Sequence, residues 1–125
     1  CLIGVEGHIG HGAVLHGCTI ERGALVGMNA VVMDDAVIGE QAIVAAMAFV
    51  KSGAVIPPRT LAAGIPAKVL RDLRDDEMKW KQEGTLSYQQ LTKRCFASLI
   101  EVTPLSEPEA DRQPLPVFGR SPKGR

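Results

Sequence analysis

Residues 20–60 read IERGALVGMNAVVMDDAVIGEQAIVAAMAFVKSGAVIPPRT, and this stretch repeats every six residues. An aliphatic residue opens each of seven successive hexads: Ile20, Val26, Val32, Ile38, Val44, Val50 and Ile56. Four residues later each hexad has a small residue, which is Ala except for Thr60 in the last hexad. Upstream, Ile3, Ile9 and Leu15 continue the frame, but one residue is missing between Leu15 and Ile20.

This period excludes an amphipathic helix, because apolar residues six apart do not share one face at 3.6 residues per turn. An ordinary antiparallel sheet is the alternative, and it gives no reason for a frame that persists over seven hexads. Repeats of this kind indicate a solenoid in which each unit stacks on the next. We therefore predict that residues 1–67 form a parallel β-helix, with the aliphatic and the small residue of each hexad pointing inward.

The six-residue period resembles that of the hexapeptide-transferase superfamily. This resemblance implies a left-handed β-helix with three hexads per coil, although the usual crossover rule favours the right hand. Equivalent residues then lie 18 apart, or 17 across the short hexad, and the turns form three edges of a prism. The first edge carries residues 11–12, 28–29 and 46–47, the second 17–18, 34–35 and 52–53, and the third 22–23, 40–41 and 58–59. The first edge is the least charged, so we expect it to be covered by another subunit or by the C-terminal helix.

The sequence after the solenoid predicts two further segments. Residues 68–102 form a C-terminal helical segment, in which Tyr88, Leu91, Cys95 and Leu99 share one face and an Asp at 75 or 76 caps the start. Gly84 is expected to break or kink this helix. Residues 103–125 contain five prolines and are expected to form an extended tail.

Composition excludes several classes of partner. Lys and Arg together number 14, as do Asp and Glu, so the net charge is zero and nothing favours nucleic acid or an anionic membrane. No apolar run is long enough to span a bilayer. Three cysteines without framework spacing fit a reducing cytoplasm. The repeat is already under way at Ile3, so we expect further coils upstream of a chain that is a fragment or a processed product.

All three histidines lie within nine residues, at positions 8, 11 and 16. Imidazole is a common zinc ligand, and a catalytic zinc usually takes three protein ligands and one water. His11 is predicted on the first edge and His16 on the following strand, so they point to different sides of the prism wall. Solvated turn histidines are the alternative. We predict that His11 and His16 are metal ligands at an interface between subunits, and that His8 is at the surface.

The strings GHIGHGAVLHGC, ALVGMNAVVMDDAVIGE and IVAAMAFVKSG resemble the γ-carbonic-anhydrase-like hexapeptide proteins. DDEMKWKQEGTLSYQQLTKRC resembles their C-terminal helix. This likeness implies a homotrimer in which three histidines bind Zn²⁺, with Fe²⁺ or Co²⁺ as alternatives, and His11 of one chain joins His16 of its neighbour. The third family histidine lies upstream of these motifs and is absent here. The fragment alone is therefore expected to bind metal weakly and to be inactive.

Several neighbouring residues could contribute to the same site. Glu6 could act as an acid or base near a metal-bound water, with a solvated loop glutamate as the alternative. Cys18 could be a thiolate ligand but is better explained as a small buried residue. We expect Met28, Asn29 and Met33 to line the floor of a largely apolar acyl pocket.

The resemblance implies an enzyme that acts on a small-molecule acyl-CoA. Within the family the chain is similar to members from phenylacetate degradation, which implies hydrolysis of CoA thioesters by a zinc-bound hydroxide. Carbonic anhydrase activity is what the wider family implies. Two alternatives remain: an acyltransferase that uses CoA and an interface histidine as general base, and a non-enzymatic accessory protein of the kind found in carnitine operons.

Overall fold

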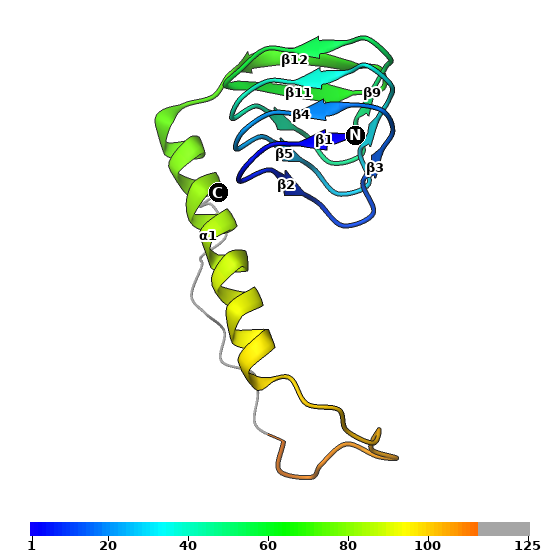
Figure 1. The fold of residues 1–125 in the computed structure, drawn as a ribbon, viewed down its shortest axis with the longest axis vertical. Helices are drawn as coiled ribbons and strands as arrows, with labels where there is room; N and C mark the ends of the chain where they lie inside the picture. The colour runs from blue at the N-terminus through cyan, green and yellow to red at the C-terminus, as the bar shows by residue number, and fades with distance from the viewer. Residues whose placement is uncertain (113–125) are drawn as a thin grey trace.

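A computed structural model describes residues 1–112 of the chain. Its first part is a parallel β-solenoid of about three turns, and its second part is one long helix, α1 (Asp75–Ser98) (Figure 1). The coils consist of ten two-residue strands: β1 (Leu2–Ile3), β2 (His8–Ile9), β3 (Val14–Leu15), β4 (Thr19–Ile20), β5 (Leu25–Val26), β6 (Val31–Val32), β7 (Val37–Ile38), β8 (Ile43–Val44), β9 (Phe49–Val50) and β10 (Val55–Ile56). The hairpin of β11 (Thr60–Gly64) and β12 (Ala67–Asp72) follows them. The predicted solenoid with a C-terminal helix is confirmed.

The strands form three sheets, one for each side of a triangular prism. Their orders are β1-β4-β7-β10, β12-β11-β8-β5-β2 and β3-β6-β9, and every pair except β11–β12 is parallel. Leu15 pairs with Val32, which is 17 residues away, whereas Ile20 pairs with Ile38, which is 18 residues away. The coil length therefore changes at the one short hexad, as the sequence predicts.

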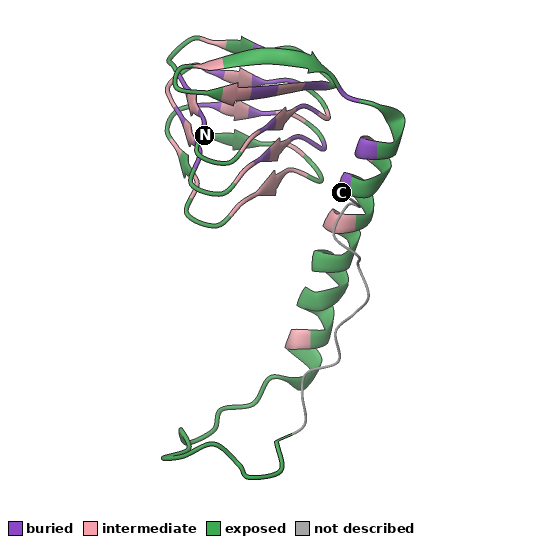
Figure 2. Ribbon diagram, turned by 180° about the vertical axis from the view of Figure 1, so that it is seen from behind, coloured by how far each residue is buried: buried purple, intermediate pink, exposed green. Residues whose placement is uncertain are grey.

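The interior of the solenoid is a stack of small aliphatic side chains. Figure 2 shows that the buried residues lie mainly in the solenoid and only sparsely in the helix. The first and fifth residues of the hexads are buried together and form the core: Ile20, Ala24, Val26, Ala30, Val32, Ala36, Ile38, Ala42, Val44, Ala48, Val50 and Ile56. Cys18 occupies the small-residue position of the short hexad and is 2% exposed. Its burial confirms that Cys18 is a packing residue in this chain.

Every corner of the prism turns through a residue with positive φ. Six of these are not glycine, namely Glu6, Asn29, Asp35, Gln41, Met47 and Arg59, and the other four are Gly12, Gly17, Gly23 and Gly53. Corners on neighbouring coils are hydrogen-bonded: the amide of Asn29 donates to the carbonyl of His11 at 2.9 Å, and the amide of Met47 to that of Met28 at 2.9 Å. These bonds satisfy backbone groups that the two-residue strands leave unpaired.

All three corners of the first edge and all three of the third edge lie at the predicted residues, but the short corner of the second edge differs from the prediction. The amide of Asp35 donates to the carbonyl of Gly17 at 3.0 Å, and Cys18 already points inward. The corner that stacks on Asp34 and Asp35 is therefore the single residue Gly17 and not residues 17–18. The reason is that the short hexad lacks one residue of its turn, whereas its buried small residue, Cys18, keeps its place in the core.

The hairpin prolongs the β-structure beyond the predicted boundary at residue 67. Residues 67–72 pair antiparallel with β11, although the sequence analysis began the helical segment at 68. Leu73, which is buried, then donates its amide to the carbonyl of Arg59 at 2.8 Å and directs the chain into the helix. Five of the six residues of β12 are exposed, so the strand has no alternation of apolar buried and polar exposed residues that would have marked it in the sequence.

Helix α1 is continuous through Gly84 and Thr85, so the predicted break is wrong. An interior glycine costs a helix only about 1 kcal/mol, and the Thr85 hydroxyl donates to the carbonyl of Lys81 at 3.2 Å. Arg74, not an aspartate, is the N-cap, and its amide donates to Glu77 at 3.1 Å. Residues 99–112 contain no helix or strand, and the rest of the predicted tail, 113–125, lies outside the described residues.

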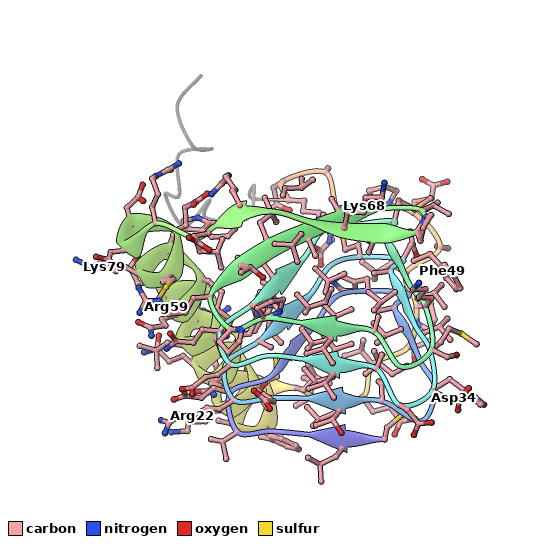
Figure 3. All side chains as sticks on the ribbon, turned by 90° about the horizontal axis from the view of Figure 1, so that it is seen from above. Arg22, Asp34, Phe49, Arg59, Lys68 and Lys79 are labelled. Atoms are coloured by element: carbon pink, nitrogen blue, oxygen red, sulfur yellow. The ribbon has the colours of Figure 1, made fainter. Side chains whose placement is uncertain are left out.

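The helix packs along the third edge of the prism (Figure 3). Arg59 pairs with Asp75 at 2.8 Å, and the ammonium of Lys81 donates to the carbonyl of Glu6 at 3.1 Å. The first edge is not covered by the helix, since Met28 and Met47 remain 54% and 63% exposed. The expectation that the helix covers the first edge is wrong, while coverage by another subunit stays a prediction.

Among residues 1–112, no helix combines the length and apolar character needed to cross a membrane.

Candidate functional site

The residues predicted to carry the chemistry lie on the first coil of the chain, at three separate corners of the prism. Glu6 follows β1 on the third edge, His11 follows β2 on the first edge, and His16 follows β3 on the second edge. One chain therefore brings none of these three side chains together. Whether His11 and His16 meet across a subunit interface stays a prediction.

His16 has a carboxylate partner that the sequence analysis missed. Its Nδ1 lies 2.7 Å from Oδ1 of Asp34, and both side chains are at least 45% exposed. A histidine whose Nδ1 is held in this way presents Nε2 outward, in an orientation and tautomer fixed by the acid. The pair is thus a histidine–aspartate dyad on an open corner.

The short hexad explains why Asp34 reaches His16. By strand register Met33 is the residue equivalent to His16, since Leu15 pairs with Val32. The next corner has two residues, Asp34 and Asp35, above the single Gly17. Asp34 therefore has no counterpart, and its Oδ1 sits against Gly17, where an added Cβ would clash with it. Comparing the two turn lengths in the sequence could have revealed this pairing.

The first-edge residues form a more apolar group around His11. Asn29 holds φ of 55° beneath the turn of His11 and Gly12, and its side-chain oxygen lies against Gly12. Met28 stands beside it, exposed, and Met47 follows one coil further. Met33 lies near His16 on the second edge, so it does not share a corner with Met28 and Asn29 within one chain.

His8 is not the free surface residue that was expected. Its Nδ1 lies 3.2 Å from the Thr85 hydroxyl, and its ring meets Tyr88 edge-on with centroids 5.3 Å apart. Burial against the helix and the nearby charge of Lys81 lower the pKa of His8. Its observed role is to hold α1 to the solenoid, so the helix contact explains this histidine.

The ligand set of a single chain does not fit a zinc ion. Across residues 1–112, no three side chains of His, Cys, Asp or Glu are grouped as a metal site requires. Burial raises the pKa of the Cys18 thiol, which opposes its use as a thiolate ligand. Glu6 lies at the third edge, where its Oε2 is 3.6 Å from Nε of Arg22, on a different corner from His11 and from His16.

Comparison with known proteins finds a repeat family that matches part of the sequence. Residues 17–52 match the family described as bacterial transferase hexapeptide (six repeats). The chain is 57% identical over 110 residues to the carnitine operon protein CaiE of Citrobacter koseri, which covers 88% of this chain and 56% of that protein. It thus spans about half the length of the curated relatives it matches.

Among the solved structures that share the fold, two examples are more than 30% identical to this chain. A candidate acetyltransferase from Bacillus cereus is 37% identical with a TM-score of 0.73, covering 74% of this chain and 54% of that one. PerB from Caulobacter crescentus, solved with CoA and GDP-perosamine, is 31% identical with a TM-score of 0.52, covering 55% of this chain and 33% of that one.

Proposed function

Because this chain carries the hexapeptide repeat of bacterial transferases, we propose that it belongs to a CoA-dependent acyltransferase with His16 as general base. The observation that carries the proposal is the 2.7 Å contact between His16 and Asp34 on an exposed corner. A dyad of this kind needs no metal, which suits a chain whose described residues group no three ligands. The relatives solved with CoA support the choice of acyl donor.

The dyad would serve the transfer in the following way. Nε2 of His16 takes the proton from the hydroxyl or amine of an acceptor as that group attacks the thioester carbonyl. The tetrahedral intermediate collapses, the C–S bond breaks, and the CoA thiolate receives the proton from the imidazolium. Asp34 stabilises the imidazolium and keeps Nδ1 protonated.

The test is acetyl transfer from acetyl-CoA, measured as release of free thiol with a panel of hydroxyl and amine acceptors. Removal of a general base typically costs about 10²–10⁴-fold, and we expect a loss of that order in kcat for His16→Asn. Asp34→Asn should cost roughly 10–100-fold. Asp35→Asn is the matched control, since Asp35 lies in the same turn but has no bond to His16, and it should retain activity. Equal losses in both aspartate variants would contradict the dyad.

We also propose that the first edge lines the predicted acyl pocket, with Asn29 facing the acyl group. Asn29→Gly preserves the turn, because glycine accepts positive φ, and removes only the amide that would face the acyl group. A changed KM for the acyl donor would support the pocket, whereas unchanged kinetics would remove Asn29 from it.

The same exposed edge is the proposed interface of a homotrimer. Met28 and Met47 are apolar, adjacent and uncovered. Met47→Glu should lower the mass measured by light scattering, and an unchanged mass would exclude this edge from the interface.

A second candidate is the metal-dependent thioester hydrolase of phenylacetate degradation. The His16–Asp34 contact also favours it, because metal-bound histidines commonly hold a carboxylate on the other nitrogen. It requires His11 and His16 from different chains and a third ligand that one chain lacks. About one zinc per site by elemental analysis, lost in His11→Gln, would favour hydrolysis over transfer. If the protein contains no metal, does not bind CoA and shows no turnover, the results would favour a non-enzymatic accessory protein.

A further inference from the structure

A cleft runs between α1 and the third edge, on the far side of the prism from Asp34. We call it the outer cleft, and it has a volume of about 590 Å³, the size of pockets that hold small metabolites. The solenoid wall includes Glu6, Arg22, Glu40 and Gln41, and the helix wall runs from Lys79 to Gln89. Figure 3 shows Arg22 and Lys79 on the helix side of the molecule, away from Asp34.

A buried ammonium group defines the inner side of this cleft. Lys81 is 5% exposed, and its Nζ donates one hydrogen bond, to the backbone carbonyl of Glu6. An ammonium group has three donors, and no carboxylate in residues 1–112 lies within ion-pair distance of Lys81. Its burial lowers the pKa of Lys81, as expected for a desolvated charge. Buried charges of this kind are normally compensated, so the position favours an anion.

The rim of the cleft limits the charge of that anion. Arg22 stands at the solenoid wall, where it can add a second cation, since its contact with Glu6 is long at 3.6 Å. Glu6, Glu40 and Glu83 also line the cleft and would repel a group with two negative charges more strongly than a group with one. The amide of Gln41 and the Thr85 hydroxyl supply hydrogen bonds for a polar ligand. The charge pattern suits a single carboxylate better than a phosphate dianion.

We propose that the outer cleft binds a small-molecule monocarboxylate, whose carboxylate accepts hydrogen bonds from Lys81 and pairs with Arg22. The site is separate from the His16 corner and does not depend on the activity proposed for it. Because one wall is the solenoid and the other is the helix, occupancy would also fasten α1 to the third edge.

The proposal can be tested by titrating the ¹⁵N-labelled protein with sodium butyrate at constant ionic strength and recording amide spectra. We expect saturable shifts at Gly23 and Thr85, which line the cleft. Lys81→Met should abolish them. Lys93→Met removes the same charge from an exposed position further along α1 and should leave them intact. Sodium phosphate at equal ionic strength should bind at least several-fold more weakly.

A second variant covers the case in which Lys81→Met fails to fold. Arg22 is exposed, so Arg22→Gln should keep the fold, checked by circular dichroism, and should weaken butyrate binding several-fold. The proposal is overturned by the absence of saturable shifts in the unaltered protein, by unchanged affinity in Arg22→Gln, or by equal shifts in Lys81→Met. Tighter binding of phosphate than of butyrate would overturn the choice of a monocarboxylate.

Discussion

Replacing Gly27 with Ala would test how closely the backbones of successive coils approach at the first edge. The amide of Gly27 donates to the carbonyl of Val44 at 2.8 Å, and an added Cβ would fall 2.7 Å from the carbonyl carbon of Ala45 and against the amide of Ala46. These are backbone atoms, so no side chain can rotate away. Overpacking typically costs about 1–3 kcal/mol, and we expect a loss near 3 kcal/mol because a shift would also stretch the coil-to-coil hydrogen bonds.

Gly53→Ala is the matched control. Gly53 has φ of 68° but nothing within 4 Å of an added Cβ. A left-handed conformation costs an L-residue about 1–2 kcal/mol, and the stiffer unfolded chain returns roughly 0.4–1 kcal/mol, which leaves a loss near 1 kcal/mol.

Urea unfolding followed by circular dichroism separates the two glycine variants. With a slope of about 1.5 kcal/mol per molar urea, the midpoint should fall by about 2 M in Gly27→Ala and by less than about 1 M in Gly53→Ala. Equal midpoint shifts with unchanged slopes would refute the reasoning, because backbone strain would then outweigh the close approach of the coils.

Three further predictions concern ionisable groups. Arg71 lowers the pKa of Glu77 to about 2, so the stability from this pair should be lost as pH falls from about 4.5 through 2; NMR titration of Arg71→Gln should show the carboxyl pKa returning upward. The pKa of His8 is lowered by burial against the helix and by the charge of Lys81, so stability that is full above about 6.5 should decline as pH falls below that value; the protection factors of α1 amides, which are corrected for the slower intrinsic exchange in acid, should fall on acidification, and His8→Gln should remove most of that dependence. Iodoacetamide should modify the exposed Cys1 well before Cys18, whose thiol is buried and has a raised pKa, and mass spectrometry after limited labelling would show the order.

The parts of the fold that depend on period alone were predictable from the sequence. Stacking places Ile20 on Ile38 whatever the surrounding residues are, because the strands contain only two residues and the corners repeat. The position of the helix was not predictable, since it depends on contacts between residues far apart, such as Lys81 with the carbonyl of Glu6. The long β12 strand was missed because it pairs antiparallel with β11 as a hairpin, and the hexad period describes only the parallel stacking of coils.

The candidate site was predictable only in part. The sequence predicts His16 as a metal ligand, which stays a prediction, and the corner assignment separates His16 from His11 as the structure does. The sequence did not identify Asp34 as the partner of His16, because counting along the strands places Met33, and not Asp34, in line with His16. A side chain can reach diagonally between unequal turns, which residue-by-residue stacking does not show; only the difference in turn length in the sequence points to it.

The dyad has a consequence for how a site can arise in a repetitive protein. In a perfectly regular array every corner presents the same backbone, and chemistry must come from side chains alone. Here the hexad between Leu15 and Ile20 is one residue short. Asp34 on the next coil therefore has no equivalent residue to stack on, and its side chain contacts His16. A single deletion in an otherwise periodic gene could therefore have created the pair in one step. Inserting one glycine after His16 would restore the symmetry and undo it.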